Sequence, residues 1–141
     1  MINRDLLNRN RNINRGYRKL IVWKEAIELN TFVKKKLNSL KSISFKVKAQ
    51  IEDLILSVHL NIVEGHYRRH LKENIQFNTI ALASLGENYS QVFSLLNSED
   101  IDKEWFHKHD QLHYSLENKL IKLNMSLINK LNDDDWNKNY E

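Results

Sequence analysis

The sequence predicts an all-α protein, an antiparallel up-down bundle of four helices, and three observations on its 141 residues support this. Proline is absent, so no residue of that type interrupts a long helix. Apolar residues recur at alternating steps of three and four in four successive segments, which is the period of a helix with one buried face. Hydrophobic residues make up 41% of the chain, which is enough for a single domain of this length to build its own core.

The four apolar stripes mark the face of each helix that we expect to be buried. Helices of about 20–30 residues joined by short turns pack antiparallel to their neighbours. In chain order, the stripes consist of Val22, Ala26, Leu29, Val33, Leu37 and Leu40; Val47, Ile51, Leu54, Val58 and Ile62; Phe77, Ala81, Leu85, Asn88, Val92 and Leu96; and Trp105, His109, Leu112, Leu116, Leu120, Leu123, Leu127 and Leu131.

Polar residues and a glycine between the stripes indicate where helices begin and end. Ser42 or Ser44 can cap the second helix, because a serine hydroxyl accepts a hydrogen bond from a free N–H of the first turn. Gly65 can end that helix in the left-handed conformation, which costs glycine little. Ser98 or Asp100 can cap the fourth helix in the same way as the serines cap the second.

The formal net charge of +4 is concentrated at the start of the chain. The first nineteen residues contain six of the 22 basic side chains and one of the 18 acidic ones, so the remaining 16 basic and 17 acidic side chains nearly balance. We therefore divide the chain into a basic Asn/Arg-rich arm at residues 1–18, the bundle at 19–132 and an acidic tail at 133–141.

Three basic groups are candidate contacts for a nucleic acid, because a cationic surface attracts a polyanion. Tyr17 and Tyr67 stand beside arginines, and stacking next to phosphate-binding side chains suits single-stranded or looped RNA. The alternative is that these charges are simply solvated. The candidate residues are Arg15, Arg18, Lys19, Lys34, Lys35, Lys36, Arg68, Arg69 and Lys72.

The second helix has a further apolar face opposite its stripe, formed by Ala49, Leu56, Leu60 and Val63. A helix of a monomeric bundle needs only one buried face, so we expect another copy of the chain to cover the second one. The alternative is that this helix lies more centrally in the core than the other three do.

No pattern in the sequence indicates an active site. The chain has no cysteine, and its three glycines are too scattered to form a phosphate-binding loop. Glu104 and His107 form a single Glu-x-x-His motif, whereas a di-iron bundle needs two. His109 and His113 lie one turn apart but lack a third ligand nearby in sequence. We therefore expect a non-catalytic protein without metal or cofactor, and a metalloenzyme is the lesser alternative.

We expect a cytoplasmic protein that has no membrane partner. The longest apolar runs are four residues, against about 20 for a membrane-spanning helix. Asn and Arg dominate the first nineteen positions, where a secretory signal would have its apolar region.

Four segments resemble, in the same order, the four-helix-bundle family first noticed in intervening sequences of ribosomal RNA genes. They are residues 14–26, residues 57–65 with Arg68 and Arg69 following, residues 77–87 and residues 116–123. This family includes the accessory variability protein of diversity-generating retroelements. The resemblance implies a homopentamer that binds RNA or DNA and serves as partner of a reverse transcriptase in mutagenic cDNA synthesis. The alternative within the family is a protein-interaction scaffold with no nucleic-acid role.

Overall fold

The computed structural model describes the backbone of residues 16–140 and the side chains of residues 16–133, so Arg15 and most of the predicted arm lie outside the described residues. All elements in this range are helical, which confirms the predicted class of four helices without strands for this part of the chain. The elements are η1 (Gly16–Lys19), α2 (Ile21–Ser39), α3 (Phe45–Tyr67), α4 (Leu71–Asn97) and α5 (Lys103–Tyr140).

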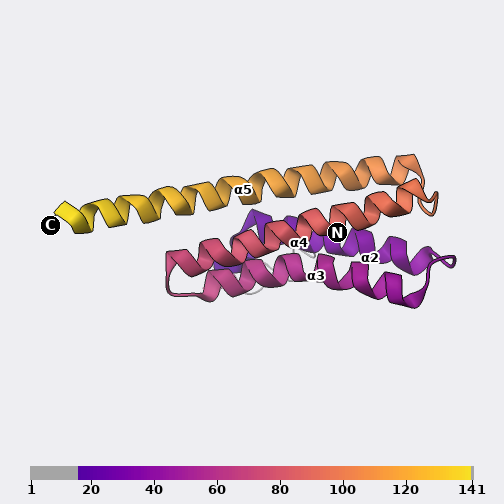
Figure 1. Ribbon diagram of the computed structural model, residues 1–141, viewed down its shortest axis with the longest axis horizontal. Coiled ribbons are helices and arrows are strands. Elements are labelled where there is room, and N and C mark those ends of the chain that lie inside the picture. The colour runs from indigo at the N-terminus through magenta and orange to yellow at the C-terminus, as the bar shows by residue number, and fades with distance from the viewer. Residues whose placement is uncertain (1–15, 141) are drawn as a thin grey trace.

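The four α-helices lie alongside one another, and their short connections fall at alternate ends of the bundle (Figure 1). α3 packs mainly on α4, α4 also packs on α5, and α2 contacts both α3 and α5. α3 and α5 therefore occupy opposite corners of the bundle, each flanked by α2 and α4. α5 is the longest helix and runs past the N-terminal end of α4 (Figure 1), and residues 133–140 of the expected tail continue this helix.

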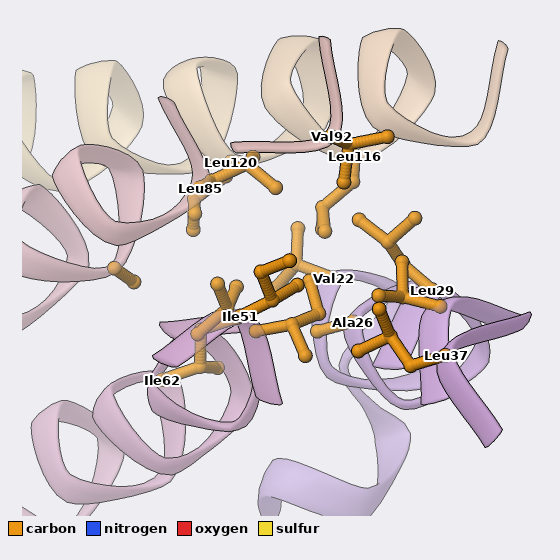
Figure 2. Packing of buried hydrophobic residues seen from close by; sticks show 14 of the residues in the cluster. Val22, Ala26, Leu29, Leu37, Ile51, Ile62, Leu85, Val92, Leu116 and Leu120 are labelled. Carbon is orange, nitrogen blue, oxygen red and sulfur yellow. The ribbon is translucent and has the colours of Figure 1, made fainter. Parts of the chain in front are cut away.

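The core is formed by the predicted stripes, with single positions exchanged in α3 and in α4, where Leu95 is buried in place of Leu96 (Figure 2). The α2 stripe is buried as expected from Val22 to Leu37. In α3 three stripe residues are buried as predicted, but Ile55 is buried in place of Leu54, which is half-buried, and Val47 is exposed. Burying a side chain such as Ile55 stabilises the fold by about 1.5–3 kcal/mol.

Gly65 does not end α3, so this prediction is wrong. The helix continues to Tyr67, and none of the glycines in the described range has a positive φ. Gly65 instead lies against α4, where a Cβ atom would come within 2.9 Å of the Phe77 Cβ and 3.1 Å of the Asn74 carbonyl oxygen. Glycine is needed here because the two helices approach each other closely just before the turn that joins them.

The prediction that Ser42 or Ser44 caps α3 is confirmed, whereas the prediction that Ser98 or Asp100 caps α5 is wrong. The Val47 N–H donates to Ser44 Oγ at 3.3 Å, so Ser44 is the cap of α3. At α5 the Trp105 N–H donates to Asp102 Oδ1 at 2.7 Å, which makes Asp102 the capping side chain in place of Ser98 or Asp100. α5 begins later than predicted because the connection from α4 first reverses direction at Glu99, which has the left-handed conformation with φ 64°.

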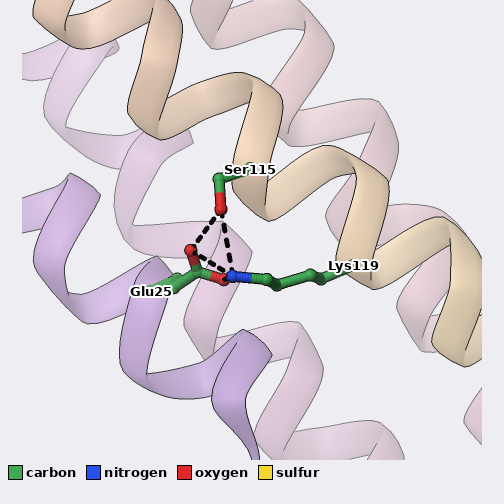
Figure 3. A network of polar contacts seen from close by, with 3 residues as sticks. All are labelled: Glu25, Ser115 and Lys119. Carbon is green, nitrogen blue, oxygen red and sulfur yellow. Dashed lines mark hydrogen bonds and ion pairs between the residues drawn. The ribbon is translucent and has the colours of Figure 1, made fainter.

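One polar network joins α2 to α5 outside the apolar core (Figure 3). Glu25 Oε1 accepts hydrogen bonds from Ser115 Oγ at 2.6 Å and from Lys119 Nζ at 3.1 Å. The Lys119 Nζ also lies 3.0 Å from Glu25 Oε2. Because Glu25 is mostly buried, this network fixes the register of α2 on α5 more firmly than an exposed ion pair would.

Candidate nucleic-acid interface

The structure brings two of the three predicted basic groups to the same end of the bundle. η1 contacts both α2 and α3, and Gly16 lies so close to the His66 ring that a Cβ atom would collide with it. The Tyr17 ring packs edge-on to Trp23 at 5.4 Å between centroids and lies 5.8 Å from the Tyr67 ring. These contacts hold η1 beside the α3–α4 connection. We call the surface formed there by Arg18, Lys19, Arg68, Arg69 and Lys72 the arginine end.

Arg68 is engaged within the protein, unlike its neighbours in the arginine end. Its guanidinium lies 2.6 Å from a Glu64 carboxylate oxygen, 3.8 Å from one of Glu73 and 4.9 Å from the centre of the Phe77 ring. Its charge is therefore largely compensated, and it closes the turn between α3 and α4. Arg69 and Lys72 are exposed and form no ion pair with any other described residue. The geometry thus favours these two over Arg68 as phosphate contacts.

Two tyrosines lie next to these cations. Tyr67 is 68% exposed at the end of α3, directly before Arg68 and Arg69. The Arg18 guanidinium lies 5.9 Å from the centre of the Tyr17 ring. Tyr17 is half-buried, so Tyr67 is the ring of the two that can stack on a base of a single-stranded nucleic acid, next to side chains that bind phosphates.

The third basic group lies at the other end of the bundle. Lys34, Lys35 and Lys36 occupy the last turns of α2, and a helix of 19 residues spans about 28 Å. The Lys36 Nζ lies 5.8 Å from the centre of the Trp105 ring, which stacks on Phe32 at 4.9 Å. A shallow pocket of ≈ 340 Å³ opens beside this stack, and Lys35 and Lys36 form part of its lining.

Acidic residues surround the lysine group on its other side. A second, larger pocket of ≈ 700 Å³ is lined by Lys36 together with Glu99, Asp100 and Asp102. These carboxylates reduce the attraction of Lys36 for a polyanion, since opposite charges at short range cancel each other's field. Within one subunit, the lysine group is therefore a separate and less favourable surface than the arginine end.

The predicted oligomer interface lies on the outer side of α3. Leu60 is 52% exposed and Leu56 is also exposed, whereas Ala49 and Val63 are half-buried. The more central position that we considered for this helix does not remove these leucines from solvent. The structure therefore leaves an apolar face on α3 that no other described part of the chain covers.

The two histidines of α5 are core residues. His109 is fully buried, both of its ring nitrogens lack a hydrogen-bond partner among the described residues, and its ring stacks on Trp105 at 5.5 Å. Burial, reinforced by the nearby His113 and opposed by Asp110, lowers the pKa of His109 to about 4. His113 Nε2 lies 3.0 Å from Glu117 Oε2. Nowhere in the described range do three His, Asp or Glu side chains gather as metal ligands would.

None of the helices described here has the length and hydropathy that crossing a membrane requires.

Comparison with family models gives a match to the family described as 23S rRNA-intervening sequence protein, over residues 18–122. Comparison with curated proteins gives no match. The family match begins in η1 and ends within α5, so it includes every residue of the arginine end and the whole of α3.

Proposed function

Because this chain belongs to the 23S rRNA-intervening sequence protein family, whose model matches it over residues 18–122, we propose that it is a non-catalytic, homo-oligomeric accessory protein that binds nucleic acid. Its unit is an antiparallel up-down bundle, and the copies associate through the apolar face of α3. The resemblance noted in the sequence favours a pentamer, with a reverse transcriptase of a diversity-generating retroelement as the partner enzyme.

The observation that carries this proposal is the composition of the arginine end. Arg18, Lys19, Arg69 and Lys72 lie at one end of the bundle, with the exposed ring of Tyr67 among them. Contacts from such side chains to phosphate oxygens supply affinity but little sequence information. We therefore expect binding to RNA or DNA that depends strongly on salt and weakly on base sequence.

Binding of a mixed-sequence single-stranded RNA, measured by fluorescence anisotropy at several salt concentrations, tests the proposal. For single strands, the slope of log K against log salt changes by about 0.7 for each phosphate contact, so Arg69→Ala with Lys72→Ala should reduce it by about 1.4. Lys108→Ala with Lys130→Ala is the matched control, because it removes the same charge from exposed positions on α5. Equal loss of binding in both double variants, or no binding by the parent chain at low salt, would contradict the proposal.

A protein-interaction scaffold is the second candidate function. It is favoured by the internal ion pairs of Arg68 with Glu64 and Glu73, which leave fewer free cations than the sequence indicates. In that case the chain should show no affinity for RNA or DNA even at low salt, and the exposed apolar faces should bind another protein.

A further inference from the structure

α5 carries acidic residues past the end of α4 at which the arginine end lies (Figure 1). The helix continues to Tyr140, and residues 133–135 are three consecutive aspartates. Lysines flank them, but residues 130–141 still contain four acidic side chains against two basic ones. Asp133 is exposed and forms no ion pair with any other described residue. The segment is therefore a local excess of negative charge.

Contacts between α4 and α5 fix the alignment of these two helices. The Asn124 side-chain amide donates to Thr79 Oγ1 at 3.2 Å and to the Ile75 carbonyl oxygen at 3.4 Å, so Asn124 lies level with the middle of that turn. About three turns further along α4, the centre of the Tyr89 ring lies 4.7 Å from that of the His113 ring. In the proposed antiparallel bundle, both contacts give the same alignment to within about one residue.

This alignment places the aspartates beside the arginine end. Lys72 lies about five residues before the middle of the turn that contacts Asn124, so it is level with Asn129 of α5. Residues 133–135 follow four to six residues later, which is about 6–9 Å further along the axis. Lys72 also stands seven residues before Thr79, so it lies on the side of α4 that faces α5. The axes of two packed helices are about 8–10 Å apart.

At this separation the aspartates act on the arginine end through their charge. The Debye length is about 10 Å at 0.1 M ionic strength, so charges this far apart are only partly screened. The carboxylates repel a phosphate that approaches Arg69 or Lys72, and they attract these two cations themselves. Both effects weaken the binding of a polyanion. Both should fade as the salt concentration rises, since the Debye length shortens to about 3 Å at 1 M.

We propose that the aspartates at residues 133–135 are an internal competitor of nucleic acid at the arginine end and limit the affinity of this surface for RNA or DNA. The competitor belongs to the same chain, so it is present at every copy of the site. This inference rests on the nucleic-acid binding in the proposed function and adds a regulation of that same site.

The test replaces the three aspartates by asparagine in the full chain, as Asp133→Asn with Asp134→Asn and Asp135→Asn. Binding of the same mixed-sequence single-stranded RNA is measured by fluorescence anisotropy, and circular dichroism checks that the helical content is unchanged. Asparagine has nearly the size of aspartate, so the variant changes charge and little else. The Kd should fall by about three- to tenfold at low salt, and the difference from the parent chain should shrink as salt is added.

The matched control removes the same charge far from the arginine end. It combines Glu87→Gln, Glu99→Gln and Glu104→Gln, which replace exposed residues that form no ion pair within the described part of the chain. Glu87 lies about 22 Å along α4 from Lys72, and the other two lie beyond the far end of that helix. The control should leave the Kd close to that of the parent chain.

A second comparison locates the competition at the arginine end. Adding the three asparagines to the Arg69→Ala, Lys72→Ala variant should improve binding less than adding them to the parent chain, because two of the cations at issue are already absent. An equal improvement in both backgrounds would overturn the inference. An equal improvement in the control, or an unchanged Kd when the parent chain binds RNA, would overturn it as well. A parent chain that binds no RNA at low salt contradicts the proposed function and removes the inference with it, so the two failures are distinguishable.

Discussion

Replacing His109 by leucine should make the protein more resistant to acid. The His109 ring is fully buried and its nitrogens have no partner among the described residues, so protonating it in the folded state is unfavourable. Burial and the nearby His113 lower the pKa of His109 from 6.5 to about 4, with Asp110 acting in the opposite direction. Leucine is similar in size and removes both the titrating group and the unpaired nitrogens.

The magnitude follows from the two pKa values. Because the folded pKa is below the unfolded one, the unfolded chain takes up the proton first as the pH falls through 6.5, and stability is lost progressively down to about pH 4. The interval between these values corresponds to a loss of about 3 kcal/mol in the free energy of unfolding. Above pH 6.5 the ring is neutral in both states and makes no such contribution.

Urea denaturation of both proteins at pH 7 and pH 4, followed by circular dichroism, measures this effect. The parent chain should lose about 3 kcal/mol more than His109→Leu over this interval. His107→Gln is the control, because it replaces an exposed histidine two residues away on the same helix. If His109→Leu and the parent lose the same free energy, the buried neutral histidine does not cause the acid sensitivity.

Four further substitutions test the packing, the α3 cap and the polar network, each by urea denaturation at pH 7. Gly65→Ala should lower the free energy of unfolding by about 1–3 kcal/mol, since its Cβ would push α3 and α4 apart. Gly86→Ala should raise the free energy of unfolding by up to about 1 kcal/mol, because no atom of another residue lies within 4 Å of a Cβ there and alanine favours the helix. A Gly65→Ala variant more stable than Gly86→Ala would contradict the close approach at Gly65. Ser44→Ala should cost about 1 kcal/mol through loss of the α3 cap, and an unchanged midpoint would show that the hydrogen bond to Val47 contributes nothing. Glu25→Ala should cost about 1–3 kcal/mol, because it leaves Ser115 and Lys119 without their acceptor. Removing Lys119 as well should restore part of this stability. A double variant Glu25→Ala with Lys119→Ala that is no more stable than Glu25→Ala alone would show that the lost contact with Lys119 does not cause the effect.

Most of the fold could be predicted because helical periodicity in the sequence reflects burial directly. The α2 stripe from Val22 to Leu37 is buried residue for residue, and Asn88 in the α4 stripe is buried as well. The inward face of α3 was harder, because Leu54 and Ile55 are both apolar and either can continue the stripe. Only the positions of α2 and α4 on the two sides of α3 decide that Ile55 faces the core.

Local conformation was less predictable where a residue type serves two purposes. A glycine before a polar turn is typical of a helix end, yet Gly65 is required by the approach of Phe77 and Asn74 from another helix. This contact joins residues about ten positions apart, so no local rule contains it.

The candidate site was predicted in part. The sequence located the cations, but it did not show that η1 packs against the α3–α4 connection, since the Tyr17–Tyr67 contact joins distant segments. The pairing of Arg68 with Glu64 could have been found, because residues four apart on a helix face each other.

The central claim is that assembly gathers several small groups of cations into one surface for a polyphosphate chain. The most direct test compares the salt dependence of RNA binding by the parent chain and by Leu60→Glu at equal chain concentration. We predict a steep slope of log K against log salt for the assembled protein and a markedly shallower one for the variant, since a single subunit offers fewer cations to one RNA molecule. Equal slopes for the two proteins would contradict the claim.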